Sequence, residues 1–392
     1  MRFNLWEDCN RVPLTELLSF IVDNRGKTVP TAPSGHKLIA TNCVTNNTLF
    51  PVYDKIRYLS EETYQTWFRA HPIPGDILFV NKGTPGRVCL VPDPVDFCIA
   101  QDMIALRADE SKIYPKYLFT VLRSREIQQQ IYNTNVGDVI PHFKKQFLDQ
   151  LLIPIPERSI QESIGDLYYV LSLKGERNKK INDNLADLLQ TIYQGRFGND
   201  ILAVNQGVLS DICSYSTDKV AVSELNVRTY FSTENMLSGK AGSTEATSLP
   251  TTSQTTACHK GDTLISNIRP YFKKIVYCED KCGCSTDVLC FTPSQPCYSA
   301  YLFSTLYADK FFAFMVAGSK GTKMPRGDKQ QIMTYPVVLP SEEELAGFNT
   351  IASPLLEQIY SNRAENKRLS ILRDTLLPKL MSGEIDVSAI QL

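Results

Sequence analysis

The sequence predicts an α+β fold in which two similar modules of mixed strands and short helices alternate with two long helices. The first observation is an internal repeat. Tyr117-Leu118-Phe119 returns as Tyr301-Leu302-Phe303, and the same offset of 184 residues holds over roughly 75 residues. The second observation is that each module gives way to a segment whose apolar residues advance by threes and fours, as on a helix. A duplicated unit implies two modules related by approximate two-fold symmetry, which suits a target that also comes in two halves.

The chain divides into four parts, in the order module, helix, module, helix. Their expected bounds are 1–155 for the first module, 156–197 for the first long helix, 198–338 for the second module, and 339–392 for the second long helix with the C-terminal tail. Within the first module we expect strands at 76–80, 88–91 and 151–156 and one helix over 114–131. Each long helix would span roughly 50 Å, which exceeds an ordinary core helix. Pro354 lies inside the second one and predicts a kink or a break there.

Composition limits the possible functions without choosing one. The 392 residues are 43% hydrophobic and 21% charged, with a net charge of -1, so the chain has no overall basic character that would indicate nucleic acid binding. A local basic groove on a neutral body would suffice for that function. The N-terminal segment lacks the apolar region of a signal peptide, and no apolar run approaches the ~18 residues of a membrane helix. We therefore expect a cytoplasmic protein with no membrane contact, whose eleven cysteines are reduced thiols.

Four segments carry a resemblance to a known family. They are IPIP at 153–156, which leads into the first long helix, YFSTENM at 230–236, GDTLISNIRPY at 261–271 and LRDTLLPKLMSGEI at 372–385. With these segments and the duplicated layout, the chain resembles a specificity subunit of a type I restriction-modification system along nearly its whole length.

The resemblance implies a fold and a set of partners. It implies two target-recognition domains held apart by two long antiparallel helices, each domain reading one half of a split site in double-stranded DNA. It also implies that two methyltransferase subunits dock on the helices, that a motor-endonuclease subunit joins them, and that the chain itself has no catalytic site. Family members carry a Glu-Gln pair near the start of each long helix. Here Ile160-Gln161 and Glu344-Leu345 each keep half of that pair, which bears on how partners dock.

Local clusters of cations, amides and hydroxyls on glycine-containing loops indicate where DNA would bind. Arginine and asparagine can contact guanine and adenine edges, while lysine and threonine suit phosphates. A glycine lets the backbone approach a phosphate closely. The alternative for each cluster is a solvated turn. The candidate residues are Arg25, Lys27, Asn81, Lys82, Thr84, Arg87, His142, Lys144, Lys145, Asn267, Arg269, Tyr271, Lys273, Lys274, Lys320, Lys323 and Arg326.

Two asparagines interrupt the apolar series of the long helices at positions that repeat every seven residues. If the helices pair antiparallel about a pseudo-two-fold axis, we expect Asn178 to face Asn362. Leu171 would then approach Leu369, and Leu185 would approach Leu355. The alternative is that both asparagines face solvent. In the paired arrangement, replacing both with leucine would raise thermal stability and loosen the preferred spacing between half-sites.

Two other function classes stay open at this stage. A self-contained metal-dependent nuclease could use Asp93, Glu110 and Lys112, and a protein-binding scaffold would need no DNA specificity. Zinc is an alternative to half-buried strand thiols for one cluster of cysteines, Cys278, Cys282, Cys284, Cys290 and Cys297, although Cys-x-x-Cys spacing is absent. We expect no bound metal and no cofactor. The sequence has no Gly-x-Gly-x-x-Gly, no complete Gly-x-x-x-x-Gly-Lys-Ser/Thr phosphate loop and no Asn-Pro-Pro-Phe-like motif.

Overall fold

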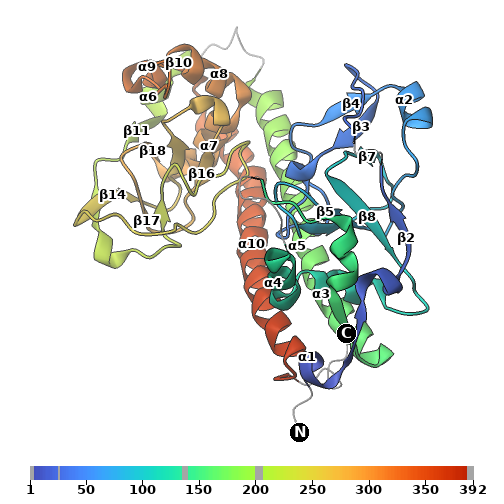
Figure 1. The fold of residues 1–392 in the computed structure, drawn as a ribbon. Helices are drawn as coiled ribbons and strands as arrows, with labels where there is room; N and C mark the ends of the chain where they lie inside the picture. The colour runs from blue at the N-terminus through green and yellow to red at the C-terminus, as the bar shows by residue number, and fades with distance from the viewer. Residues whose placement is uncertain (1–3, 25–26, 135–139, 199–205, 386–392) are drawn as a thin grey trace. The chain divides into compact units, whose positions relative to one another are not determined.

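The computed structural model describes residues 4–24, 27–134, 140–198 and 206–385. The chain forms two compact units, and each is described by itself. The first unit combines residues 1–179 with 364–392, and the second is the continuous segment 180–363. Both long helices therefore contribute residues to both units (Figure 1).

In the first unit, three small sheets form around a core of apolar side chains. Their strand orders are β2(Leu18–Val22)-β8(Met103–Ala108)-β5(Ile77–Val80)-β6(Val88–Leu90), β4(Arg57–Leu59)-β3(His36–Ile39)-β7(Phe97–Ile99) and β1(Asn10–Pro13)-β9(Leu152–Ile155). The short helices are α1(Leu5–Asp8), η1(Leu14–Leu17), η2(Thr41–Cys43), α2(Glu61–Thr66), α3(Pro115–Leu122), α4(Arg125–Asn133) and η3(Lys145–Gln150). β5 pairs antiparallel with both neighbours, and all four of its side chains are buried, which explains its unbroken apolar sequence.

The single helix expected over 114–131 is in fact two helices, α3 and α4. α3 ends at Leu122 with Arg123 as its C-cap. Ser124 caps α4, because its hydroxyl accepts a hydrogen bond from the backbone N–H of Ile127. The break leaves a helix N-terminus at Arg125, a feature that apolar periodicity alone does not reveal.

α3 packs closely on the first long helix. A side chain at Gly165 would place its Cβ 2.6 Å from the backbone nitrogen of Tyr117, so this close approach requires glycine. The Tyr117 hydroxyl donates to the carbonyl oxygen of Pro154 at 2.8 Å, which joins α3 to β9. In the second unit the repeated residue Tyr301 donates to Val338 in the same way. The tyrosine of the repeated Tyr-Leu-Phe segment therefore has the same role in each unit.

The second unit repeats this plan. Its sheets have the orders β11(Cys213–Tyr215)-β18(Val288–Pro293)-β15(Thr263–Ser266)-β16(Ile275–Tyr277), β12(Lys219–Ala221)-β14(Gln254–Cys258)-β17(Cys282–Cys284)-β13(Tyr230–Phe231) and β10(Gln206–Val208)-β19(Pro336–Val338). Its short helices are α6(Leu209–Ile212), η4(Val222–Glu224), η5(Pro270–Phe272), η6(Pro296–Tyr298), α7(Ser299–Tyr307), α8(Asp309–Ala317) and α9(Lys329–Met333). α7 and α8 stand in the repeat where α3 and α4 stand in the first unit.

The two long helices are α5(Arg158–Phe197) and α10(Glu342–Met381), with 40 residues each. Within each unit their segments pair antiparallel: Arg373 lies over the Tyr168 ring in the first unit, and Tyr193 contacts Phe348 in the second. α10 continues through Pro354, so the expected break does not occur. Among the described residues, no helix is both long enough and apolar enough to cross a membrane. The predicted α+β fold with two long helices is confirmed.

Candidate nucleic-acid interface

In the first unit, two of the expected DNA-binding loops lie side by side. The loop after β5 is joined to residues 141–143 by two backbone hydrogen bonds. Gly83 donates to Pro141 at 2.9 Å, and Phe143 donates to Asn81 at 2.8 Å. Lys82 and His142 form an isolated antiparallel bridge between these bonds. Two clusters about 60 residues apart in sequence therefore form one surface feature.

The second unit has the same arrangement of backbone bonds. Arg269 donates to Pro325 at 2.8 Å, Gly327 donates to Asn267 at 3.3 Å, and Ile268 forms the bridge with Arg326. We call each joined pair of segments a paired loop: 81–87 with 141–143, and 267–274 with 325–327. The backbone is the same in both, yet the side chains differ at the bridge, where Lys82 and His142 are replaced by Ile268 and Arg326.

The two asparagines brace the paired loops. Asn81 is 5% exposed and Asn267 is 8% exposed. Their backbone N–H groups donate to the equivalent residues Asp102 and Asp287, at 2.9 and 2.8 Å. Nδ2 of Asn81 donates to the carbonyl oxygen of Phe143 at 3.3 Å, and the side-chain oxygens of both asparagines are buried with no hydrogen-bond partner among the described residues. The backbone bonds of both asparagines, and the side-chain amide of Asn81, therefore fix the loops from beneath.

The candidate cations fall into two groups. One group is exposed and has no ion pair or side-chain hydrogen bond among the residues that the structure describes: Lys27, Lys82, Arg87, Lys144 and Lys323. The other group already has partners: Lys145 with Asp23, Lys273 with Asp309, Lys274 with the carbonyl of Thr233, Lys320 with Asp328, and Arg326 with Asp287. Hydrogen bonds from Lys240 and Lys273 lower the pKa of Asp309. A phosphate that binds Lys273 would therefore have to compete with the Asp309 carboxylate. Arg25 lies outside the described residues.

Arg269 has an unusual backbone conformation. Its φ is 50°, in the left-handed region, and Gly83, the corresponding residue of the first paired loop, also has a positive φ of 85°. Glycine accepts this conformation freely, whereas arginine does not. Beside it, Tyr271 and Phe272 are 49% and 39% exposed, and their ring centroids are 4.7 Å apart. Thr84 and His142 are half-buried.

The asparagines of the long helices are buried, which excludes the solvent-facing alternative. Asn178 is 1% exposed, and its Nδ2 donates to Asn366 at 2.9 Å and to Glu365 at 2.6 Å. Asn362 is 6% exposed and donates to Asn182 at 2.8 Å. The expected direct pair of Asn178 with Asn362 stays a prediction, and each of these asparagines forms an amide pair within its own unit. The leucines expected to flank it, Leu171, Leu185, Leu355 and Leu369, are half-buried.

Asn182 and Asn366 are not among the site residues expected from the sequence. Both are part of the 184-residue repeat, in which Asn178 and Asn182 return as Asn362 and Asn366. The repeat therefore contained a signal for them. The interval of four residues within each pair also places both amides on one face of a helix.

The residues of the nuclease alternative have other partners. Nζ of Lys112 contacts Asp109 at 3.3 Å and the carbonyl oxygen of Glu16 at 3.0 Å. The backbone oxygen of Glu110 accepts from Arg158 at 3.0 Å. Among the described residues, no hydrogen bond or ion pair joins Asp93, Glu110 and Lys112 to one another.

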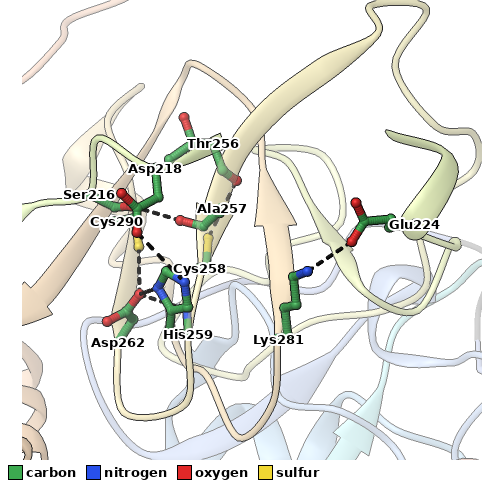
Figure 2. Close-up of polar contacts among 10 residues, drawn as sticks. All are labelled: Ser216, Asp218, Glu224, Thr256, Ala257, Cys258, His259, Asp262, Lys281 and Cys290. Atoms are coloured by element: carbon green, nitrogen blue, oxygen red, sulfur yellow. Dashed lines mark hydrogen bonds and ion pairs between the residues drawn. The ribbon is translucent and has the colours of Figure 1, made fainter. Parts of the chain in front are cut away.

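The cysteine cluster is part of the apolar core of the second unit. Cys258 joins it, whereas Cys297 is exposed and apart from it. The sulfur atoms of Cys278 and Cys282 are 3.5 Å apart. Figure 2 shows that the Cys290 thiol donates to Oδ2 of Asp262, which also accepts from the backbone N–H of His259 at 2.8 Å. In the described part of the chain, no group of three or more His, Cys, Asp or Glu residues is arranged to hold a metal ion.

Two repeated α+β units, each with a paired loop and with segments of two long helices, define an internally duplicated protein. Residues 19–189 match the family model described as the type I restriction modification DNA specificity domain. This segment, under half of the chain, is therefore similar to that family, which agrees with the resemblance drawn from the sequence.

Individual relatives agree with the family model. A stretch of 73 residues is 34% identical to the type I restriction enzyme MjaIX specificity subunit of Methanocaldococcus jannaschii, covering 19% of this chain and 17% of that one. Another stretch of 153 residues is 24% identical to the type I restriction enzyme HindI specificity subunit of Haemophilus influenzae. It covers 38% of this chain and 33% of that one. The matches thus span less than two thirds of either relative. In fold, the chain is similar to the type I restriction-modification S subunit from M. genitalium, with a TM-score of 0.59 and 17% sequence identity. The similarity covers 97% of this chain and 98% of that one.

Proposed function

We propose that this chain is the DNA sequence-recognition subunit of a type I restriction-modification complex. Each paired loop reads one half of a bipartite site in double-stranded DNA. The observation that carries the proposal is that one backbone scaffold occurs twice with different side chains on it. Two different half-sites require this combination, because a common backbone fixes the docking geometry while the side chains choose the bases.

The chemistry of the paired loops supports this division of roles. The exposed and unpaired lysines, such as Lys144 and Lys323, suit phosphate contacts, which position a protein on DNA without choosing a sequence. Arg269 and the exposed ring of Tyr271 suit contacts with base edges in the second paired loop. The first paired loop offers Lys82, Thr84 and Arg87 instead. A salt-dependent general affinity and a sequence-dependent increment would therefore come from different residues.

The proposal assigns the chemistry to partner subunits. Two methyltransferase subunits would dock on α5 and α10, and a motor-endonuclease subunit would join them, so this chain is non-catalytic, needs no cofactor of its own and acts in the cytoplasm. The retained halves of the family's Glu-Gln pairs have roles within the chain. Gln161 joins the start of α5 to Tyr114 and Pro156, and Glu344 forms a capping box with Ser341 at the start of α10.

Methylation-site mapping tests the proposal in cells with and without the gene for this chain. We expect a bipartite methylated motif that disappears when the gene is deleted and returns when it is restored. A deletion strain with an unchanged methylation pattern, in which the methyltransferase genes are expressed, would contradict the proposal.

A further inference from the structure

The first unit contains a cavity of about 290 Å³ that the DNA-reading function does not use. It is bounded by the N-terminus of α4, by α5 and by the C-terminal part of α10. Three arginines line it: Arg123, Arg125 and Arg373. The remaining lining includes the Tyr168 ring and the apolar side chains of Leu377 and Met381.

Two of these arginines are almost fully buried. Arg123 is 8% exposed, and its NH2 group donates to the carbonyl oxygens of Val88, at 2.7 Å, and Thr48, while its Nε is buried without a partner. Arg373 is 9% exposed, and its Nε donates to Asp374 at 2.8 Å. Neither terminal nitrogen of Arg373 has a hydrogen bond or ion pair within the described residues. The terminal nitrogens of Arg123 are satisfied within the unit, because NH1 also donates to the Tyr168 hydroxyl at 3.3 Å and NH2 to the carbonyl oxygen of Thr45 at 3.2 Å. Burial of a guanidinium is costly unless its donors are satisfied, so the terminal nitrogens of Arg373 indicate an anionic ligand.

The net charge of the lining indicates how much negative charge that anion carries. Three arginines stand against two carboxylates, Glu126 and Asp374, which leaves one positive charge. The nine-residue helix α4 adds the positive end of its dipole at Arg125. This balance suits one carboxylate better than a row of phosphates, because the two acids would repel a polyanion.

We propose that this cavity binds a single carboxylate, an aspartate or glutamate side chain, of a protein partner. The guanidiniums of Arg123 and Arg373 are recessed, and a flexible side chain can reach them, whereas the backbone of a stiff duplex cannot. The apolar lining suits the stem of such a side chain. The inference rests on the proposed function, which makes the methyltransferase subunit the partner to test.

The second unit does not repeat this cavity lining. The 184-residue offset places Tyr307 where the first unit has Arg123, Asp309 where it has Arg125, and Leu189 where it has Arg373. Tyr168 corresponds to Ala352. The carboxylate site is therefore particular to the first unit, so two otherwise equivalent partner copies would be held differently.

The experiment measures the affinity of the purified full-length chain for the purified methyltransferase subunit by calorimetry. Arg373→Gln should weaken the complex at least roughly tenfold, because it removes a buried charge from a hydrogen-bonded pair. Arg368→Gln is the matched control, since Arg368 is exposed on the same helix with no side-chain contact among the described residues. It should stay within about twofold of the parent. Arg125→Gln is the second test variant, because Arg125 is exposed and its loss leaves the core intact.

The outcomes separate the two proposals. If the parent chain binds the methyltransferase subunit but Arg373→Gln and Arg125→Gln bind as tightly as Arg368→Gln, the carboxylate site is wrong while the proposed function stands. If the parent chain binds no methyltransferase subunit, both fail. If the two variants weaken DNA binding alone, the ligand is a phosphate, and the carboxylate proposal is overturned. A weakened complex with an unchanged melting temperature of the free chain supports it.

Discussion

At the scale of residues, one position with a shared backbone conformation carries different residues in the two paired loops. Position 83 is glycine and position 269 is arginine, although both have positive φ. Holding a non-glycine residue in the left-handed region costs about 1–2 kcal/mol. The second unit tolerates this cost at a residue whose Nε is buried without a partner. Strain of this kind gathers where a side chain is needed for function.

We predict that Arg269→Gly and Arg269→Ala both weaken discrimination at one half-site, by about 1–3 kcal/mol. They should differ in stability. Glycine relieves the strain, so the free energy of unfolding should be unchanged or raised by up to about 1 kcal/mol, whereas alanine keeps the strain. Binding to DNA with single-base changes in each half-site, combined with denaturant unfolding, checks both parts. Equal losses at both half-sites would refute the two-reader arrangement.

Lys144 and Lys323 should act without regard to sequence. Both are exposed and unpaired within the described residues, so each is available to a phosphate. We predict that Lys144→Ala and Lys323→Ala weaken binding to every sequence alike. Each should flatten the slope of log affinity against log salt by about 0.9. Binding titrations at several salt concentrations give the slope, and Lys179→Ala on α5 is a control. A change confined to the cognate sequence would contradict this role.

At the scale of elements, the buried amides set which residues of the long helices lie opposite one another. Asn178 pairs with Asn366 in the first unit, and Asn362 pairs with Asn182 in the second. Nδ2 of Asn366 and Nδ2 of Asn182 also donate to the carbonyl oxygens of Gly175 and Ile359, each at 3.1 Å. Sliding one helix past the other would separate these groups and leave them buried without partners.

These partners change the expected effect of leucine at Asn178 and Asn362. Replacing only these two leaves the side-chain oxygens of Asn182 and Asn366 without their donors. We therefore expect a lower free energy of unfolding, by about 1–3 kcal/mol for each unsatisfied group, rather than the gain in thermal stability expected from sequence. Leucine at all four asparagines should recover much of the loss, because apolar groups replace both partners. Denaturant unfolding of the double and quadruple variants decides between the two expectations.

At the scale of the whole molecule, the two units differ in continuity. The second unit is one segment, 180–363, whereas the first needs residues from both ends of the chain. Leu377, Leu380 and Met381 of α10 belong to the core of the first unit. The first unit is therefore incomplete until the C-terminal part of the chain has been made.

We predict that a fragment of residues 180–363 melts cooperatively on its own, while a fragment of residues 1–179 does not. Leaving out the C-terminal part of α10 exposes apolar surface of the first unit's core, at about 25 cal/mol per Å². A fusion that joins residues 364–385 ahead of residue 4 through a flexible linker should restore the cooperative transition. Circular dichroism melting curves of the three fragments supply the measurement. A cooperative melt of 1–179 alone would contradict the division.

The sequence by itself determined the repeat, the order of module and helix, and the resemblance to a family. Those features follow from local chemistry: the spacing of apolar residues sets helix and strand periods, and the recurrence of Tyr117 as Tyr301 or Asn178 as Asn362 is written in the residues. The basic and glycine-containing loops were also identifiable, because their composition is local.

Only the tertiary structure decided which of those residues meet. It joined Gly83 to Pro141 and Arg269 to Pro325, buried Asn81 and Asn267 beneath their loops, and gave Lys273 and Arg326 carboxylate partners. It also paired Asn178 with Asn366 and gathered Arg123, Arg125 and Arg373 around one cavity. Contacts between residues far apart in sequence depend on how the elements pack, and local patterns do not encode that packing.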